Sequence, residues 1–228
     1  MYFWKCWRDT RSFALVFLVI AAAAMPVTAV VGKGTNLQEG FGPSVFLSTF
    51  VLMLFVVALG LGTISAIQEF TDKTSHFLFT KPRPRPYFVW AGWVVGCLEF
   101  LTIAFVNLFA GWLTLAHYSK NPSWSVLRAL FKEQDVVGVL IYTLFIYCLT
   151  YSMTIVLRNG LKGLGASMGI TFGLQATQIA LRMRWNINVP LPPLPIGSLP
   201  IIVSNIVWIV VALLIVFAAQ LVVERSEI

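Results

Sequence analysis

The sequence predicts an all-α membrane protein with six transmembrane helices, an N-terminal interfacial helix and a cytoplasmic helix between the second and third spans. The 228 residues are 58% hydrophobic and only 11% charged, which is too few charges to cover a soluble domain of this size. Six apolar runs each approach the ~20 residues that a spanning helix needs. Cations cluster in several of the segments between these runs, as is typical at membrane surfaces. We therefore expect residues 1–228 to form a single transmembrane domain.

The first twelve residues interleave aromatic and cationic side chains. The members are Phe3, Lys5 and Arg8, with Trp4, Trp7 and Arg11 between and after them. This mixture suits a helix that lies on the membrane surface, so we expect an interfacial helix over residues 1–12. The apolar run that follows lacks the cleavage site of a signal peptide and is expected to be retained as the first span.

The six spans are predicted at about residues 13–31, 45–67, 87–116, 136–157, 161–181 and 200–223. The third run is longer than ~20 residues, so we expect it to tilt, or to protrude and break near Gly111. Only Arg158, Asn159 and Gly160 separate the fourth run from the fifth. This spacing predicts a tight turn between antiparallel neighbours.

The connection at 68–86 is polar, basic and flanked by long apolar runs. Its first part, residues 69–79, predicts about three turns of amphipathic helix with Phe70, Phe77 and Leu78 available for an apolar contact. The prolines at 82, 84 and 86 lack a backbone N–H and disfavour helix in the residue before them. We therefore expect a helix across the mouth of two spans, followed by a stiff cationic arm.

The distribution of Lys and Arg predicts the orientation. With a cytoplasmic N-terminus and six spans, ten of the sixteen Lys and Arg residues lie on the cytoplasmic side and six on the other. Both termini are therefore expected in the cytoplasm.

Several classes of catalytic site have no counterpart in the sequence. There is no GxxxxGK[ST] phosphate-binding loop and no HExxH zinc motif, and there is no supported GxSxG nucleophile motif. Cys6, Cys97 and Cys148 are isolated, as are His76 and His117, so we predict neither a metal site nor a disulfide framework. Catalysis by this chain alone is not expected.

Glu99 is the acidic residue placed well inside a predicted span. Counted from Tyr87 it lies roughly 18 Å along the helix, and a carboxylate facing lipid there would cost several kcal/mol. A stripe of small or polar side chains shares its helix face: Gly92, Gly96, Ile103 and Asn107. We predict that this face lies against protein or water. Glu99 and Asn107 are then candidates for lining a translocation path, or alternatively Glu99 is a hydrogen-bonded packing residue.

Glycines on the fifth run recur every four residues, at Gly165, Gly169 and Gly173. This small-xxx-small spacing lets two helix backbones approach closely, so we interpret it as a helix-packing face.

The arrangement resembles the ABC-2 type permeases, the membrane subunits of one class of ABC exporters. The residues that carry the resemblance are Gly60 and Gly62 in the second span, Glu69 at its end, Thr74, and then Pro82, Arg83 and Arg85 before the third span. Members of that family usually have a basic residue after the glutamate, whereas this chain has Phe70. The architecture covers nearly the whole chain, while the motif is short and degenerate.

The resemblance implies a permease that acts as a dimer in a bacterial cytoplasmic membrane, with each copy docked on a separate ABC ATPase subunit. The second copy would be an identical or a related chain. ATP and its Mg would bind to the ATPase, and the helix at 69–79 would be the coupling helix. The coupling residues would be Glu69, Phe70, Thr74, Phe77, Leu78, Pro82 and Arg83. The direction implied is export.

Two other classes remain open from the residues themselves. One is a channel or secondary carrier whose basic loop serves only as a topology anchor. The other is a non-transporting scaffold that recruits a soluble partner through the proline-rich arm at 81–86, read as a polyproline II ligand.

Overall fold

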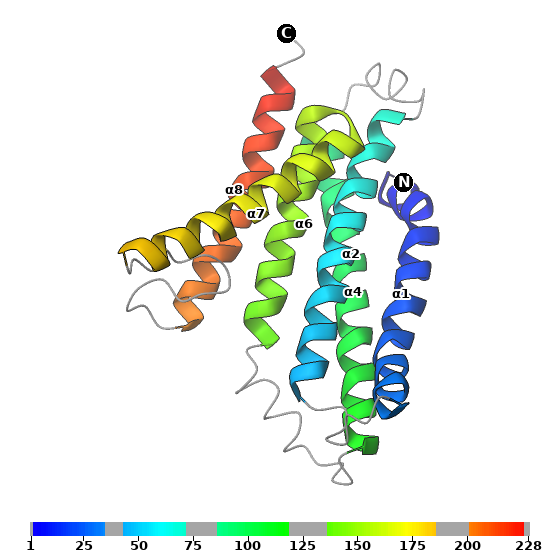
Figure 1. Cartoon of the computed structure of the whole chain (residues 1–228). Helices are drawn as coiled ribbons and strands as arrows, with labels where there is room; N and C mark the ends of the chain where they lie inside the picture. Colours follow the sequence, from blue (N-terminus) through cyan, green and yellow to red (C-terminus); the bar gives the residue numbers. More distant parts are fainter. Residues whose placement is uncertain (1, 35–42, 72–85, 119–135, 186–200, 226–228) are drawn as a thin grey trace.

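The computed structural model describes residues 2–34, 43–71, 86–118, 136–185 and 201–225, and within these ranges the chain is helical with no strand. Its six helices are α1 (Tyr2–Gly34), α2 (Pro43–Thr71), α4 (Pro86–Tyr118), α6 (Val136–Leu157), α7 (Gly160–Trp185) and α8 (Ile201–Arg225). Figure 1 shows α1, α2, α4 and α6 as an elongated bundle, with α7 and α8 running obliquely along one side. The all-α prediction is confirmed.

Five of these helices are long and apolar enough to cross a membrane. Their candidate spans are Phe3–Val30, Val45–Ile67, Val89–His117, Val136–Leu157 and Ile202–Arg225. The predicted span at 161–181 does form a helix, α7, but Lys162, Gln175 and Gln178 and several glycines lower its hydropathy. Membrane-spanning character is thus found for five of the six predicted spans, and a crossing by α7 stays a prediction.

The predicted break after residue 12 is wrong, and of the two alternatives for the third run the break near Gly111 does not occur. α1 continues through residues 12 and 13 without interruption, so the first twelve residues are the first turns of a long helix rather than a separate interfacial helix. No glycine or proline occurs between Tyr2 and Met25 to end the helix earlier, and Pro26 lies inside it. α4 likewise runs unbroken past Gly111, whose missing side chain leaves room for the ring of Phe46.

α6 is the central helix of the bundle. Fourteen of its 22 residues are buried, and it packs against α2, α7 and α8. Two of its tyrosines also tie it to α4: the Tyr147 hydroxyl donates to the carbonyl oxygen of Trp93 at 3.0 Å, and that of Tyr151 to Val89 at 2.6 Å. Because both rings are fully buried, these bonds fix the position of α4 relative to α6.

The predicted turn between the fourth and fifth runs is present. Arg158 adopts the left-handed conformation with φ of 49°, and the side-chain oxygen of Asn159 accepts a 3.1 Å bond from the backbone N–H of Lys162. α7 then packs on α6 through Gly163 beside Thr154 and through Ser167, whose Oγ accepts from Thr150 at 3.1 Å. Beyond Thr171 its side chains are mostly exposed, and Figure 1 shows α7 diverging from the bundle.

Both chain ends lie at one end of the bundle (Figure 1). α2 ends and α4 begins at the end of the bundle where α1 begins and α8 ends. Residues 69–71, the start of the predicted coupling helix, are the last residues of α2. The rest of that predicted helix lies outside the described residues.

Candidate functional site

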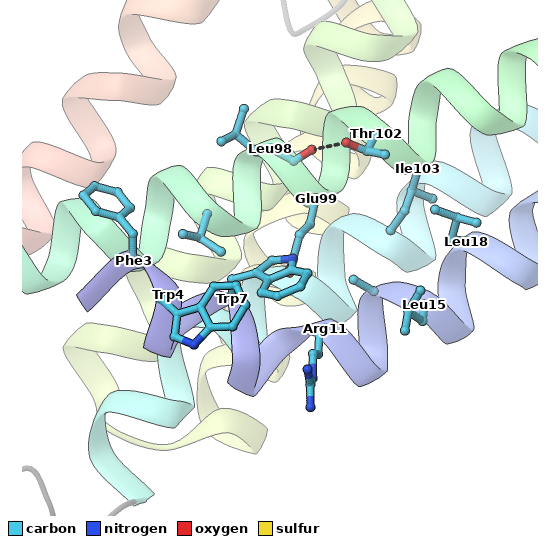
Figure 2. A pocket seen from close by; sticks show the side chains of 12 residues that line it. Phe3, Trp4, Trp7, Arg11, Leu15, Leu18, Leu98, Glu99, Thr102 and Ile103 are labelled. Atoms are coloured by element: carbon cyan, nitrogen blue, oxygen red, sulfur yellow. Dashed lines mark hydrogen bonds between the residues drawn. The ribbon is translucent and has the colours of Figure 1, made fainter. Parts of the chain in front are cut away.

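A groove of about 760 Å³ lies between the first half of α1 and the middle of α4. Figure 2 shows its lining side chains, most of which are apolar. The carboxyl group of Glu99 is the acidic group among them. Pockets of ~300–1,000 Å³ with apolar walls and few polar groups are typical of sites for small molecules. This groove is therefore the candidate functional site.

Glu99 points from α4 toward α1 (Figure 2) and is only 8% exposed. The hydroxyl of Thr10, itself buried, donates to Oε1 of Glu99 at 2.6 Å. Oε2 is also buried and has no hydrogen-bond partner among the described residues. One carboxyl oxygen is thus satisfied by α1, and the other remains an acceptor that a bound donor group would satisfy.

Aromatic and cationic side chains form one end of the groove. The indoles of Trp4 and Trp7 have ring centroids 4.8 Å apart and an interplanar angle of 41°, and they are 61% and 41% exposed. The guanidinium carbon of Arg11 lies 6.0 Å from the centroid of the Trp7 ring. The rim therefore presents two indole faces and, on the far side of Trp7, the positive charge of Arg11, which points away from Glu99 (Figure 2).

The contact between α1 and α4 favours a position of Glu99 near the membrane surface, because it sets Glu99 beside the cationic turns of α1. The two helices run in the same direction (Figure 1), and Thr10 pairs with Glu99, an offset of 89 residues. By that offset the cationic stretch at 5–11 of α1 stands beside residues 94–100 of α4. Lys and Arg side chains avoid the hydrocarbon core. If the first turns of α4 project beyond the core, the depth of Glu99 is less than the roughly 18 Å counted from Tyr87; that depth stays a prediction.

The length of α4 agrees with this position. Its 33 residues span about 50 Å at ~1.5 Å per residue, whereas the hydrocarbon core is ~30 Å thick. Trp90 and Trp93 lie in the projecting turns, where interfacial tryptophans are common. The Trp90 indole donates to Oε1 of Gln220 on α8 at 2.6 Å, which ties this end of α4 to the C-terminal helix.

Asn107 lies two turns further along α4 and does not line the groove. It is fully buried, and neither its Oδ1 nor its Nδ2 has a hydrogen-bond partner among the described residues. The two path candidates therefore occupy different environments: Glu99 lines a groove on the flank, and Asn107 is enclosed in the bundle. A role of either residue in a translocation path stays a prediction.

The residues predicted to contact an ATPase are only partly within the described ranges. Glu69 and Phe70 belong to the last turn of α2, while Thr74, Phe77, Leu78, Pro82 and Arg83 lie outside the described residues. Of the glycines in the same motif, Gly60 lies against the ring of Phe17, and Gly62 lies against the α6 backbone at Tyr147. Both motif glycines therefore have a packing role.

Within the described residues, nothing contacts the predicted packing face of α7. A methyl group added at Gly165, Gly169 or Gly173 would meet no atom within 4 Å. All three glycines are exposed, so any helix that packs on them must come from elsewhere. In the described ranges, no three His, Cys, Asp or Glu side chains lie close enough to hold a metal ion.

Thr10 was not predicted as a site residue. Its signal in the sequence is indirect: a carboxyl group in an apolar run needs a hydrogen-bond donor, and Thr10 is one of many hydroxyls that could supply one. Trp4, Trp7 and Arg11 were singled out as interfacial residues, but their position beside Glu99 follows only from the packing of α1 on α4.

Comparison of the chain with models of known families, with curated proteins and with solved structures found no match. The function is therefore inferred from the sequence pattern and from the geometry described above.

Proposed function

We propose that this chain is the membrane-spanning permease subunit of an ATP-driven ABC exporter of the ABC-2 type. It would bind a separate ATPase subunit through the segment at 69–79, and it would form the translocation path together with a second permease copy. The chain would hold no nucleotide itself, since ATP and its Mg would bind to the partner ATPase. Channel, secondary-carrier and scaffold functions are the alternatives that the test below distinguishes.

The observation that carries this proposal is the position of the connection between α2 and α4. The end of α2 and the start of α4, between which the connection runs, lie at the end of the bundle where α1 begins and α8 ends (Figure 1). A helix in this connection would face a soluble partner directly and would pull on two long spans when that partner moves. The motif residues Gly62 and Glu69 belong to the half of α2 that leads to this end.

The charges support a cytoplasmic location for this end. Described Lys and Arg residues gather there at the start of α1, at the turn from α6 to α7 and at the end of α8; they are Lys5, Arg8, Arg11, Arg158, Lys162 and Arg225. Three other Lys and Arg residues within the described helices lie away from this end: Lys33 near the end of α1, and Arg182 and Arg184 near the end of α7. By the positive-inside rule the end with the termini faces the cytoplasm, and a cytoplasmic ATPase would dock there.

Reconstitution with a candidate ABC ATPase tests the proposal. The tagged full-length chain is expected to co-purify with the ATPase and, in proteoliposomes, to support ATP-dependent export with substrate-stimulated hydrolysis. Solute flux through vesicles that contain the chain alone would instead indicate a channel or carrier. A soluble partner that binds without hydrolysing ATP, in the absence of any flux, would indicate a scaffold.

The open glycine face of α7 is the feature that supports a second permease copy. Gly169→Leu is expected to shift the detergent-solubilised chain from dimer to monomer without unfolding it, because leucine would block the close backbone approach, while a Cβ atom at this exposed position meets no atom of the described residues within 4 Å. Cross-linking and light scattering measure the oligomeric state. Ala23→Leu, at an exposed position on α1, is the matched control and should remain dimeric. A dimer that tolerates leucine at Gly169 would exclude this face from the interface.

A further inference from the structure

We infer that the groove between α1 and α4 binds a membrane phospholipid whose head group carries a primary ammonium. The ammonium would donate to Oε2 of Glu99 after a shift of the side chains that enclose this oxygen, the phosphate would lie near Arg11, and an acyl chain would follow the apolar wall. This inference requires only that the chain spans a membrane, so it is independent of the proposed coupling to an ATPase.

The groove opens on the outer flank of the bundle, where lipid surrounds a membrane protein. Leu15 and Leu98, which line it from the two helices, are each 60% exposed. Leu18 and Ile103 continue the apolar wall away from the charged end (Figure 2). A lipid tail can enter such a groove sideways without crossing a polar barrier.

The polar groups select the head group. Glu99 offers a buried oxygen without a donor. A primary ammonium carries three N–H donors and a positive charge, so it satisfies this oxygen better than a hydroxyl does. The neighbouring faces of Trp4 and Trp7 also attract cations. Arg11 adds a positive charge that complements the phosphate of the same zwitterionic head group.

The inferred depth of the groove in the membrane suits a lipid head group rather than the end of an acyl chain. Pairing of Thr10 with Glu99 sets Glu99 beside the cationic turns of α1. Arg11 and the two indoles therefore mark the membrane surface, as belts of tryptophan and arginine commonly do. The wall from Leu15 and Leu98 to Leu18 and Ile103 extends from this level toward the hydrocarbon core.

Native mass spectrometry of the wild-type chain tests this site without any substitution. The chain is reconstituted in vesicles that contain equal amounts of phosphatidylethanolamine, phosphatidylcholine and phosphatidylglycerol with identical acyl chains, and is then extracted in mild detergent. Phosphatidylethanolamine is expected to be retained about tenfold over phosphatidylcholine, which lacks N–H donors, as expected for one charge-assisted hydrogen bond. Equal retention of these two lipids would overturn the pairing with Glu99.

Two carboxyl variants then locate the site. Glu99→Gln is expected to lower the ratio of retained phosphatidylethanolamine to phosphatidylglycerol by about tenfold, because the amide carries no negative charge. Glu224→Gln is the matched control: Glu224 lies at the same end of the bundle but on α8, outside the groove, where its Oε1 accepts from Gln220 at 2.9 Å. If the wild type retains phosphatidylglycerol in preference to phosphatidylethanolamine, lipid binding depends on the surface charges instead. The same conclusion follows if Glu99→Gln and Glu224→Gln lower the ratio of the two lipids equally. The inference would also be overturned if the wild-type chain retained no lipid because a second copy of the chain covers the groove.

Discussion

Gly62→Leu is expected to prevent assembly of the helix bundle. A Cβ atom at position 62 would lie 2.9 Å from Cβ of Thr150, 3.0 Å from the carbonyl oxygen of Tyr147 and 3.2 Å from the backbone nitrogen of Tyr151. Backbone atoms of a helix cannot move aside individually, so α2 and α6 would have to separate. Even Gly62→Ala should cost about 1–3 kcal/mol, the usual range for overpacking, and leucine should cost more.

Thermal unfolding and size-exclusion chromatography in detergent measure this effect. Gly62→Ala should lower the unfolding temperature, and Gly62→Leu should give little or no monodisperse protein. Ala218→Leu, which adds three carbon atoms at an exposed position of α8, is the control and should behave as wild type. Normal yield and stability of Gly62→Leu would show that α2 and α6 are not in backbone contact at this point.

The double variant Phe77→Ala with Leu78→Ala is expected to abolish coupling to the ATPase. Apolar side chains on a polar connection at the cytoplasmic end need a partner surface to leave water, and they are then typical anchors of an interface. Burial of a large apolar side chain contributes roughly 1.5–3 kcal/mol, so loss of two should weaken binding by on the order of 100-fold or more.

The affinity of the purified chain for the ATPase, together with transport-linked hydrolysis in vesicles, gives the readout. Ser75→Ala changes the same segment without removing an apolar anchor and should leave both quantities near their wild-type values. The membrane bundle of the double variant should unfold at the wild-type temperature, because both substitutions lie outside the helices described. If binding and transport survive both alanines, the segment is only a tether.

The helices themselves could be predicted because a bilayer requires long apolar runs, and such runs can be recognised directly in the amino-acid sequence. The break after residue 12 was predicted wrongly because aromatic and cationic side chains report the environment of a helix. They do not report where its backbone ends. Because that part of α1 contains no glycine or proline, the backbone hydrogen bonds of the helix continue through it.

The candidate site could be predicted only in part. Glu99 stands out because a carboxyl group is rare in an apolar run, but its depth depends on how far α4 projects from the membrane. The hydrogen-bond partner of Glu99 is Thr10, 89 residues away in sequence, and no local pattern identifies this pairing. The glycines of α7 show the opposite case: their spacing predicts a close helix approach but does not identify the partner, and none of the six described helices occupies the face.

The central position of α6 has a consequence for biosynthesis. Helices leave the ribosome in chain order, so α2 and α4 are already in the membrane when α6 is inserted, while α7 and α8 are not. α6 carries many hydroxyl groups, among them the buried Thr143, Thr150 and Tyr147, which a lone helix in lipid would expose. Its contacts with α2 and α4 give partners to some of these hydroxyl groups as soon as α6 has been inserted. α8, which packs chiefly on α6, then completes a bundle whose other helices have already assembled.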